Sequence, residues 1–144
     1  MLSNTCKYAV RACIYLALNA DEEKKIGIKK IAEDLKIPMP FLGKILQILA
    51  KNKLLASTKG PNGGFCLGKP ANKISLMNIV DLIDGDTSFT GCVVGLKSCT
   101  ESQAHCAIHE RYFPIREEIK KLFEEQNIEE LATSIKNSEH LVAI

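Results

Sequence analysis

The sequence predicts a mainly helical fold with one small β-hairpin. Apolar residues recur at helical spacing through most of the chain, and one segment near residue 60 is rich in Gly, Pro and Asn between two strand-like runs. The composition is that of an ordinary globular protein, with 46% hydrophobic and 25% charged residues among 144. This length fits one compact domain, or a small domain with an added oligomerisation segment.

Three helices are predicted in the first part of the chain, at 4–19, at 28–36, and from Pro40 to about Asn52. In each of them apolar residues recur every three or four positions, so that one face is buried. The third begins near Pro40 because proline is favoured in the first helical turn. The second and third are short and joined by a tight turn, which is the helix-turn-helix pattern. The predicted buried stripe of the third helix consists of Leu42, Ile45, Leu46 and Leu49.

A β-hairpin is predicted directly after these helices. The runs 54–58 and 65–68 flank the segment 59–64, whose sequence is Lys-Gly-Pro-Asn-Gly-Gly. A hairpin in this position is the wing of a winged helix. A fourth helix is predicted at 75–84, ending at Gly85 as helix C-termini often do.

The last third of the chain differs from the first part. Residues 86–106 lack helical or strand periodicity, and a long irregular stretch in a compact chain is usually functional or disordered. Beyond it, apolar residues alternate at spacings of four and three, which is a heptad seam. Pro114 interrupts the seam, so the helix either kinks there or begins near it. A final helix is predicted at 127–136. The seam consists of Ile108, Tyr112, Ile115, Ile119 and Leu122.

Charge is unevenly distributed along the chain. Residues 1–73 carry thirteen Lys or Arg and five Asp or Glu, a net charge of +8, whereas residues 74–144 carry −6. This asymmetry suggests a module that binds a polyanion, followed by a segment that does not contact it. We therefore expect three parts: a winged-helix DNA-binding domain at 1–85, a cysteine-bearing loop at 86–106, and dimerisation helices at 107–144.

Several classes of protein are disfavoured. The chain has no apolar run of the ~20 residues that a membrane span needs, and its start lacks the regions of a secretory signal, so we expect a cytoplasmic protein. In a reducing compartment six cysteines are unlikely to form a disulfide framework. No phosphate loop, nucleophile motif or paired carboxylates point to an enzyme.

The candidate DNA-binding residues lie on the second and third helices and on the wing. The N-terminal residues of a recognition helix meet base edges, while neighbouring lysines contact phosphates. Phe41 could touch a thymine methyl group, and Lys44 could donate to a guanine or a phosphate. The alternative is that Phe41 belongs to the core and that the lysines only solvate the surface. The candidates are Lys29, Lys30, Met39, Pro40, Phe41, Lys44, Lys59, Gly60 and Asn62.

Three cysteines lie on the irregular segment with six residues in each gap: Cys92, Cys99 and Cys106. His109 follows closely, so three thiolates and one imidazole make a complete set of four ligands. His105 is an alternative fourth ligand. Soft thiolates select zinc, copper(I) or iron–sulfur clusters, and the spacing leaves cluster and zinc undecided, although zinc sites more often contain a tight cysteine pair. Of the other cysteines, we expect Cys13 and Cys66 in the core and leave Cys6 open.

The chain resembles the IscR/NsrR type of winged-helix regulators, the "Rrf-two" family, over essentially its whole length. The resemblance rests on Lys-Tyr-Ala-Val-Arg-Ala at 7–12, Ile-Ala at 31–32, the wing at 57–67, and the spaced cysteines followed by His109. It implies a homodimer that joins through the long C-terminal helix, binds palindromic operators in double-stranded DNA and ligates a 2Fe–2S or 4Fe–4S cluster on the three cysteines. His109 matches the histidine ligand of the IscR type. The NsrR type instead uses an acidic residue near the N-terminus of the partner, where this chain has Cys6-Lys7-Tyr8, with no acid. The resemblance therefore favours His109 as the fourth ligand and leaves Cys6 as an alternative.

The chain also departs from the family pattern. Its cysteine gaps are longer than usual, Gly43 stands where the IscR type carries a glutamate used in base discrimination, and Lys59 replaces the usual wing arginine. The predicted function is a DNA-binding repressor that senses cluster, redox or nitric oxide status, with a cluster that is easily lost in air. The alternatives are a zinc-bound or metal-free winged-helix regulator that responds to a thiol or protein signal, and a redox or cluster-carrier protein without a DNA role.

Overall fold

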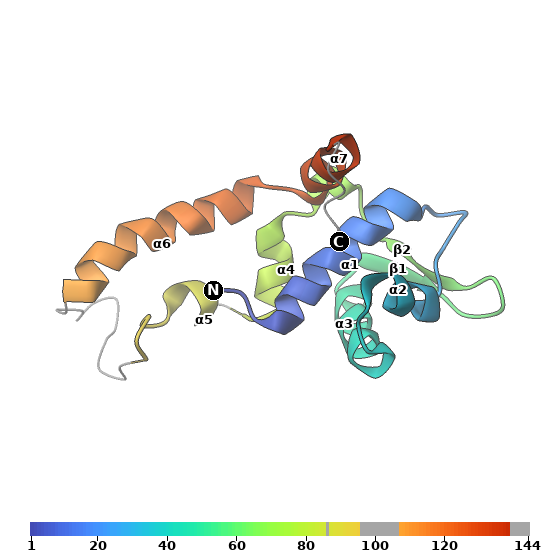
Figure 1. Ribbon diagram of the computed structural model, residues 1–144, viewed down its shortest axis with the longest axis horizontal. Helices are drawn as coiled ribbons and strands as arrows, with labels where there is room; N and C mark the ends of the chain where they lie inside the picture. Colours follow the sequence, from blue (N-terminus) through green and yellow to red (C-terminus); the bar gives the residue numbers. More distant parts are fainter. Residues whose placement is uncertain (86, 96–106, 139–144) are drawn as a thin grey trace.

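The computed structural model describes residues 1–85, 87–95 and 107–138. These residues form a mainly helical fold with one two-stranded antiparallel hairpin, as predicted. In Figure 1, α2, α3 and the hairpin gather on one side of α1, while α6 projects as a long arm on the other side. The elements are α1 (Asn4–Asn19), α2 (Ile28–Leu35), α3 (Met39–Lys51), β1 (Leu55–Thr58), β2 (Gly64–Leu67), the short 3-10 helix η1 (Ala71–Lys73), α4 (Leu76–Ile83), α5 (Thr87–Thr90), α6 (Ala107–Glu125) and α7 (Ile128–Asn137).

Side-chain caps define several helix starts. The Ser3 hydroxyl accepts a hydrogen bond from the Cys6 amide at 3.0 Å and so caps α1. A reciprocal capping box between Ser75 and Asn78 begins α4, and Asn127 begins α7 in the same way. Every helix predicted from the sequence is present, and most of the predicted boundaries agree with the structure to within a residue or so.

The core is built around α1. The predicted stripe of α3 is confirmed, since its three leucines and its isoleucine are all buried, and Cys13 and Cys66 are buried as expected. Cys6, which the sequence left open, is also fully buried. The largest fully buried side chains are Leu16, Ile31, Leu35, Leu42, Ile45, Leu46, Leu49, Ile74, Ile79, Val80 and Ile128.

The turn between α6 and α7 is hydrogen-bonded to the residues at the start of α4. The Leu76 amide donates to the Gln126 carbonyl and the Ile128 amide donates to the Ile74 carbonyl, both at 2.9 Å. Ile128 is fully buried, and α7 packs on α1. The final helix, which the sequence analysis grouped with the dimerisation helix, therefore completes the core around α1.

The structure contains one helical turn that the sequence pattern does not predict, and it decides where α6 begins relative to Pro114. Residues 86–106 show no periodicity in the sequence, yet Thr87–Thr90 form the single helical turn α5. One turn is too short to produce a periodic pattern, and a tertiary contact supports it: the rings of Phe89 and Phe123 lie edge-on at 5.6 Å. Helix α6 continues through Pro114 instead of beginning there. Proline removes one hydrogen bond to the carbonyl of Glu110, an exposed residue, where water can replace it.

Candidate functional site

The start of α3 is exposed on the side opposite its buried stripe. Lys36 ends α2 in the left-handed conformation (φ 54°), and Ile37 is buried in the turn, so the chain reverses tightly before α3. Met39 is 48% exposed and Phe41 40%, and Lys44 lies on the same accessible side. The structure thus presents one cation and two apolar side chains at the end of the helix that enters the major groove in winged-helix proteins.

Phe41 lies between the two roles considered for it. Part of its ring packs edge-on against the ring of Tyr8 in α1, with centroids 5.8 Å apart and planes at 89°. The remaining part is exposed and available for contact with another molecule.

The wing is held by close backbone packing. Thr58 pairs with Gly64 in the hairpin, and a Cβ at the neighbouring Gly63 would lie 2.2 Å from the Thr58 carbonyl oxygen. A Cβ at Gly64 would lie 2.5 Å from the Ile26 carbonyl group. The backbones of Gly64 and Ile26 come this close because Ile26 and Phe65 exchange two backbone hydrogen bonds, of 3.0 and 2.8 Å. The predicted contact residues Lys59, Gly60 and Asn62 are exposed at the tip of this hairpin.

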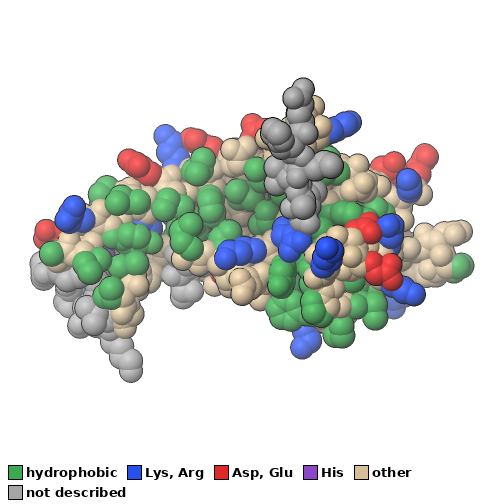
Figure 2. All heavy atoms as spheres, in the orientation of Figure 1, with side chains coloured by type: hydrophobic (Ala, Val, Ile, Leu, Met, Phe, Trp, Pro, Cys, Tyr) green, Lys and Arg blue, Asp and Glu red, His purple; other side chains and the backbone are tan. Residues whose placement is uncertain are grey.

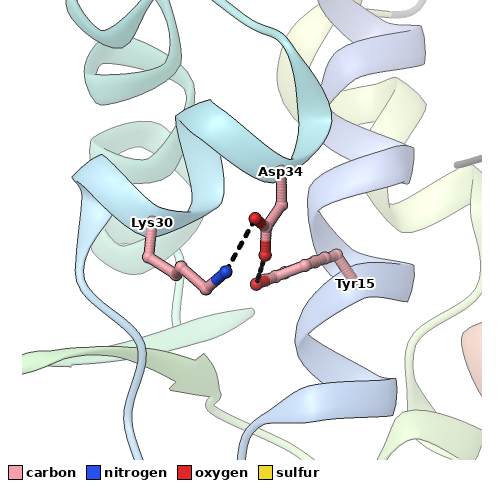
Figure 3. A network of polar contacts seen from close by, with 3 residues as sticks. All are labelled: Tyr15, Lys30 and Asp34. Atoms are coloured by element: carbon pink, nitrogen blue, oxygen red, sulfur yellow. Dashed lines mark hydrogen bonds and ion pairs between the residues drawn. The ribbon is translucent and has the colours of Figure 1, made fainter.

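The two lysines at the front of α2 differ in their surroundings. Lys29 is exposed, whereas Lys30 donates to Asp34 at 2.8 Å, and Asp34 also accepts from the Tyr15 hydroxyl at 2.5 Å (Figure 3). The hydrogen bonds from Lys30 and from Tyr15 lower the pKa of Asp34. Burial, together with the bond to Asp34, raises the pKa of Tyr15 to about 12. This network, which the sequence analysis missed, joins α1 to α2.

Two further contacts of the helix-turn-helix were also missed. The guanidinium of Arg11 donates to the Leu35 carbonyl at 2.9 Å and lies 5.7 Å from the centroid of the Tyr8 ring. A Cβ at Gly43 would lie 3.3 Å from Cδ1 of Ile28, so the small residue permits close packing of α3 on α2. The only sequence signal for these contacts was the family-like segment 7–12, which contains both Tyr8 and Arg11.

The structure describes two members of the predicted ligand set. Cys92 is half-buried just after α5, and His109 is half-buried in the first turn of α6, where its ring stacks on Phe113 at 5.9 Å. Cys99, Cys106 and the alternative ligand His105 lie outside the described residues. Within 1–85, 87–95 and 107–138, no group of three or more potential metal ligands comes together.

The remaining cysteines have the surroundings of core residues. Burial raises the pKa of Cys6 to about 12, with a smaller contribution from Asp84, and burial raises the pKa of Cys13 to about 12 as well. Burial also raises the pKa of Cys66. A cysteine must lose its proton to bind a metal, and a raised pKa opposes that loss. Cys6 is therefore a poor fourth ligand in its own subunit, which leaves His109 as the favoured candidate among the described residues.

A helix-turn-helix followed by a wing, with exposed lysines on both, defines the class: the protein is a DNA-binding transcriptional regulator and not an enzyme. Residues 2–134 match the model of the Rrf2 family, described as iron-dependent transcriptional regulators. The chain belongs to this family. No helix of the described residues is both long and apolar enough to cross a membrane.

Similar sequences and solved structures agree with this assignment. The chain is 32% identical over 138 residues to the regulator NsrR of Oceanobacillus iheyensis, covering 95% of this chain and 92% of that protein. It is 29% identical over 133 residues to the regulator IscR of Pectobacterium atrosepticum, covering 92% and 79%. Among solved structures, the global cysteine regulator CymR of B. subtilis superposes with a TM-score of 0.76 at 23% identity, covering 93% and 97%. The IscR of T. potens gives 0.76 at 19% identity, covering 97% and 91%. These two structures share the fold.

Proposed function

We propose that this regulator represses transcription as a homodimer on palindromic DNA, and that it responds to an iron–sulfur cluster held by Cys92, Cys99, Cys106 and His109. The observation that carries the proposal is the contrast between two sets of cysteines. Cys6, Cys13 and Cys66 are spread through the core, whereas Cys92 is half-buried on a segment whose three cysteines are evenly spaced. That division separates thiols that fill space from thiols suited to ligation.

The donor chemistry fits such a cluster. Three thiolates and one imidazole are a ligand set found in cluster-binding proteins, and the half-buried positions of Cys92 and His109 leave them accessible for loading. When bound, an iron–sulfur cluster supplies a group that oxidants and nitric oxide can modify.

The positions of the two described ligands suggest how a signal reaches the fold. Cys92 follows α5, which contacts α6 through Phe89 and Phe123, and His109 lies in the first turn of α6. Ligands that share one group would fix the first turn of α6 relative to the segment after α4. That constraint would bias the spacing of the two recognition helices in a dimer.

The partner is a second copy of this chain, docked along the apolar face of α6. Ile108, Ile115 and Leu122 recur every seven residues and are 51%, 52% and 54% exposed. Hydrophobic side chains gather over the projecting arm in Figure 2. Long exposed apolar rows at heptad spacing are typical of helix pairing, and a palindromic site requires a two-fold dimer.

The test is anaerobic purification followed by a visible absorption spectrum and iron and sulfide analysis of the full chain. We expect coloured protein with matching iron and sulfide, and loss of both in Cys92→Ala and in His109→Ala. Cys13→Ala is the matched control, since it removes a core thiol, and it should keep the cluster. Binding of a duplex that the wild-type protein enriches from a random library is then compared for protein with and without its cluster, and the two affinities should differ.

Contrary results have definite meanings. Colourless protein that resists reconstitution, or equal loss of iron in Cys13→Ala, would contradict the cluster assignment. Bound zinc would instead support a zinc-containing regulator, and absence of any metal would support a thiol- or protein-responsive regulator of the same fold as the cysteine regulator CymR. Failure to enrich any DNA sequence would contradict the proposed operator binding.

A further inference from the structure

We propose that Tyr8 and Arg11 of α1 are positioning residues for sequence recognition: they fix how α3 presents Phe41 to DNA. The inference rests on the proposed recognition of an operator by α3. It assigns to the first helix a specificity role that acts through another residue.

The first contact lies at the entrance to the helix-turn-helix turn. Leu35 is the last residue of α2, and the Arg11 guanidinium donates to its carbonyl at 2.9 Å in a partly buried position. The last carbonyls of a helix have no partner within the helix and carry partial negative charge. Helix α2 has no basic residue in its own last turn, so the cation comes from α1. Arg11 thereby fixes the point where the chain leaves α2.

The second contact lies just beyond the turn. The Phe41 ring, in the first turn of α3, meets the Tyr8 ring edge-on, with centroids 5.8 Å apart. Arg11 lies against the same Tyr8 ring, 5.7 Å from its centroid. The cation holds the Tyr8 ring, which in turn limits the positions that the Phe41 ring can adopt. The turn at 36–38 is thus held from α1 at both ends.

This arrangement matters for recognition because no side chain caps the start of α3. Pro40 favours a helix start at this point, but Pro38, the residue before the helix, makes no side-chain hydrogen bond, so the direction of the first turn also depends on tertiary contacts. Phe41 is nevertheless 40% exposed at the end of the helix that faces DNA. A ring held by Tyr8 can distinguish a thymine methyl from its absence, whereas an unrestrained ring would discriminate less.

Two simpler roles must be separated from this one by experiment. Tyr8 could contribute only to the packing of the fold. In that case its loss would lower the stability of the protein and would weaken binding to every DNA sequence equally. Arg11 could contact a phosphate directly, in which case its loss would reduce the salt dependence of binding by about one phosphate contact.

The experiment is a double-mutant cycle on DNA affinity with the full chain. The probes are a duplex enriched by the wild-type protein from a random library and a scrambled duplex of the same length, each titrated at several salt concentrations. The variants are Tyr8→Leu, Tyr8→Phe, Arg11→Met, Phe41→Leu and the combination of Tyr8→Leu with Phe41→Leu. Circular dichroism checks folding, and Tyr8→Met replaces Tyr8→Leu should the latter not fold.

We expect Tyr8→Leu and Arg11→Met to lose roughly three- to tenfold in affinity for the enriched duplex and little for the scrambled one. Tyr8→Phe keeps the ring and should bind like the wild type. In the Phe41→Leu background, Tyr8→Leu should cause no further loss, because its effect passes through Phe41. The slope of log affinity against log salt should stay the same in every variant.

Other outcomes overturn the inference. Additive losses in the combined variant, or equal losses on both duplexes, would show that Tyr8 does not act through Phe41. A lower salt slope in Arg11→Met would make Arg11 a direct phosphate contact. If the wild-type protein enriches no sequence, the proposed operator recognition fails, and this inference fails with it.

Discussion

Single side chains on one face of α1 connect that helix to the helix-turn-helix. Tyr8, Arg11 and Tyr15 are spaced three and four residues apart, so they lie above one another on the same face. They contact Phe41, the Leu35 carbonyl and Asp34 respectively. Each contact is polar or aromatic and reaches a different point of α2 or α3, so these side chains help to set the orientation of α1, and Tyr15 is also buried in the core.

The network around Asp34 predicts a pH-dependent stability. Its hydrogen bonds from Lys30 and Tyr15 lower the pKa of Asp34 in the folded state. The stabilisation is therefore present above the unfolded-state pKa of about 3.9 and is lost as the pH falls through the lower folded-state pKa. We expect Asp34→Asn to be less stable than the wild type at neutral pH, and the difference to vanish in acid. Urea unfolding from neutral to acidic pH measures this.

The control for that experiment is Glu33→Gln, which removes a carboxylate from the neighbouring exposed position of the same helix. A difference between Asp34→Asn and the wild type that stayed constant down to the lowest pH would show that the charge of Asp34 does not contribute to stability.

At the scale of elements, the wing depends on a backbone approach that only glycine permits. The strand β2 pairs with β1 on one side and with Ile26 on the other, and the contact with Ile26 leaves no space for a side chain at Gly64. Gly64 also has a φ of +153°, which favours glycine. The position of the wing relative to α2 is thus set by main-chain contacts.

We expect Gly64→Ala to lower the free energy of unfolding by about 1–3 kcal/mol, because the added methyl group must displace the Ile26 backbone. DNA affinity should fall with it, since the wing tip moves. Gly27→Ser is a matched control: it adds a side chain in open space with ordinary backbone angles and offers α2 the cap it lacks. Urea unfolding should find this control as stable as the wild type or slightly more so; equal stability of both variants would contradict the packing argument.

At the scale of the whole molecule, the fold separates a basic helical domain from a projecting arm. The C-terminal end of α6 is anchored by the bonds between 126–128 and 74–76, while its apolar row faces outward. We propose different roles for these two parts, DNA binding for the helical domain and dimerisation for the arm. The change of net charge along the sequence from +8 to −6 does not coincide with this division, because α4 and α7 lie in the acidic half of the chain and pack on α1.

We expect Ile115→Glu to yield a folded monomer with reduced affinity for the library-enriched duplex. A carboxylate in the middle of the apolar row opposes helix pairing, but Ile115 is 52% exposed in the single chain, so little of its own core is lost. Analytical ultracentrifugation measures the mass, and circular dichroism the helix content. The exposed substitution Glu118→Gln should leave the wild-type mass unchanged; an Ile115→Glu protein of wild-type mass would place the dimer contact elsewhere.

Much of the fold could be predicted because local periodicity and turn chemistry agree with it. The stripe of α3, the start of that helix near Pro40 and the glycine-rich wing all follow from short-range rules, and each was found within a residue or so of the prediction. The exposure of the first turn of α3 was likewise predictable, since its buried stripe lies on the other face.

The sequence by itself determined the winged helix-turn-helix and the buried stripes of its helices, because these follow from residues close together in the chain: the stripes from spacings of three and four, and the wing from its glycine-rich turn. The division of charge follows from composition alone. Only the tertiary structure decided the burial of Cys6, the packing of α7 on α1, and the contacts of Tyr8, Arg11 and Tyr15 with the helix-turn-helix. Those features join residues distant in the chain, such as Arg11 and Leu35, or Ile74 and Ile128. Their geometry depends on how whole helices cross, and a pattern of neighbouring residues carries no information about that crossing.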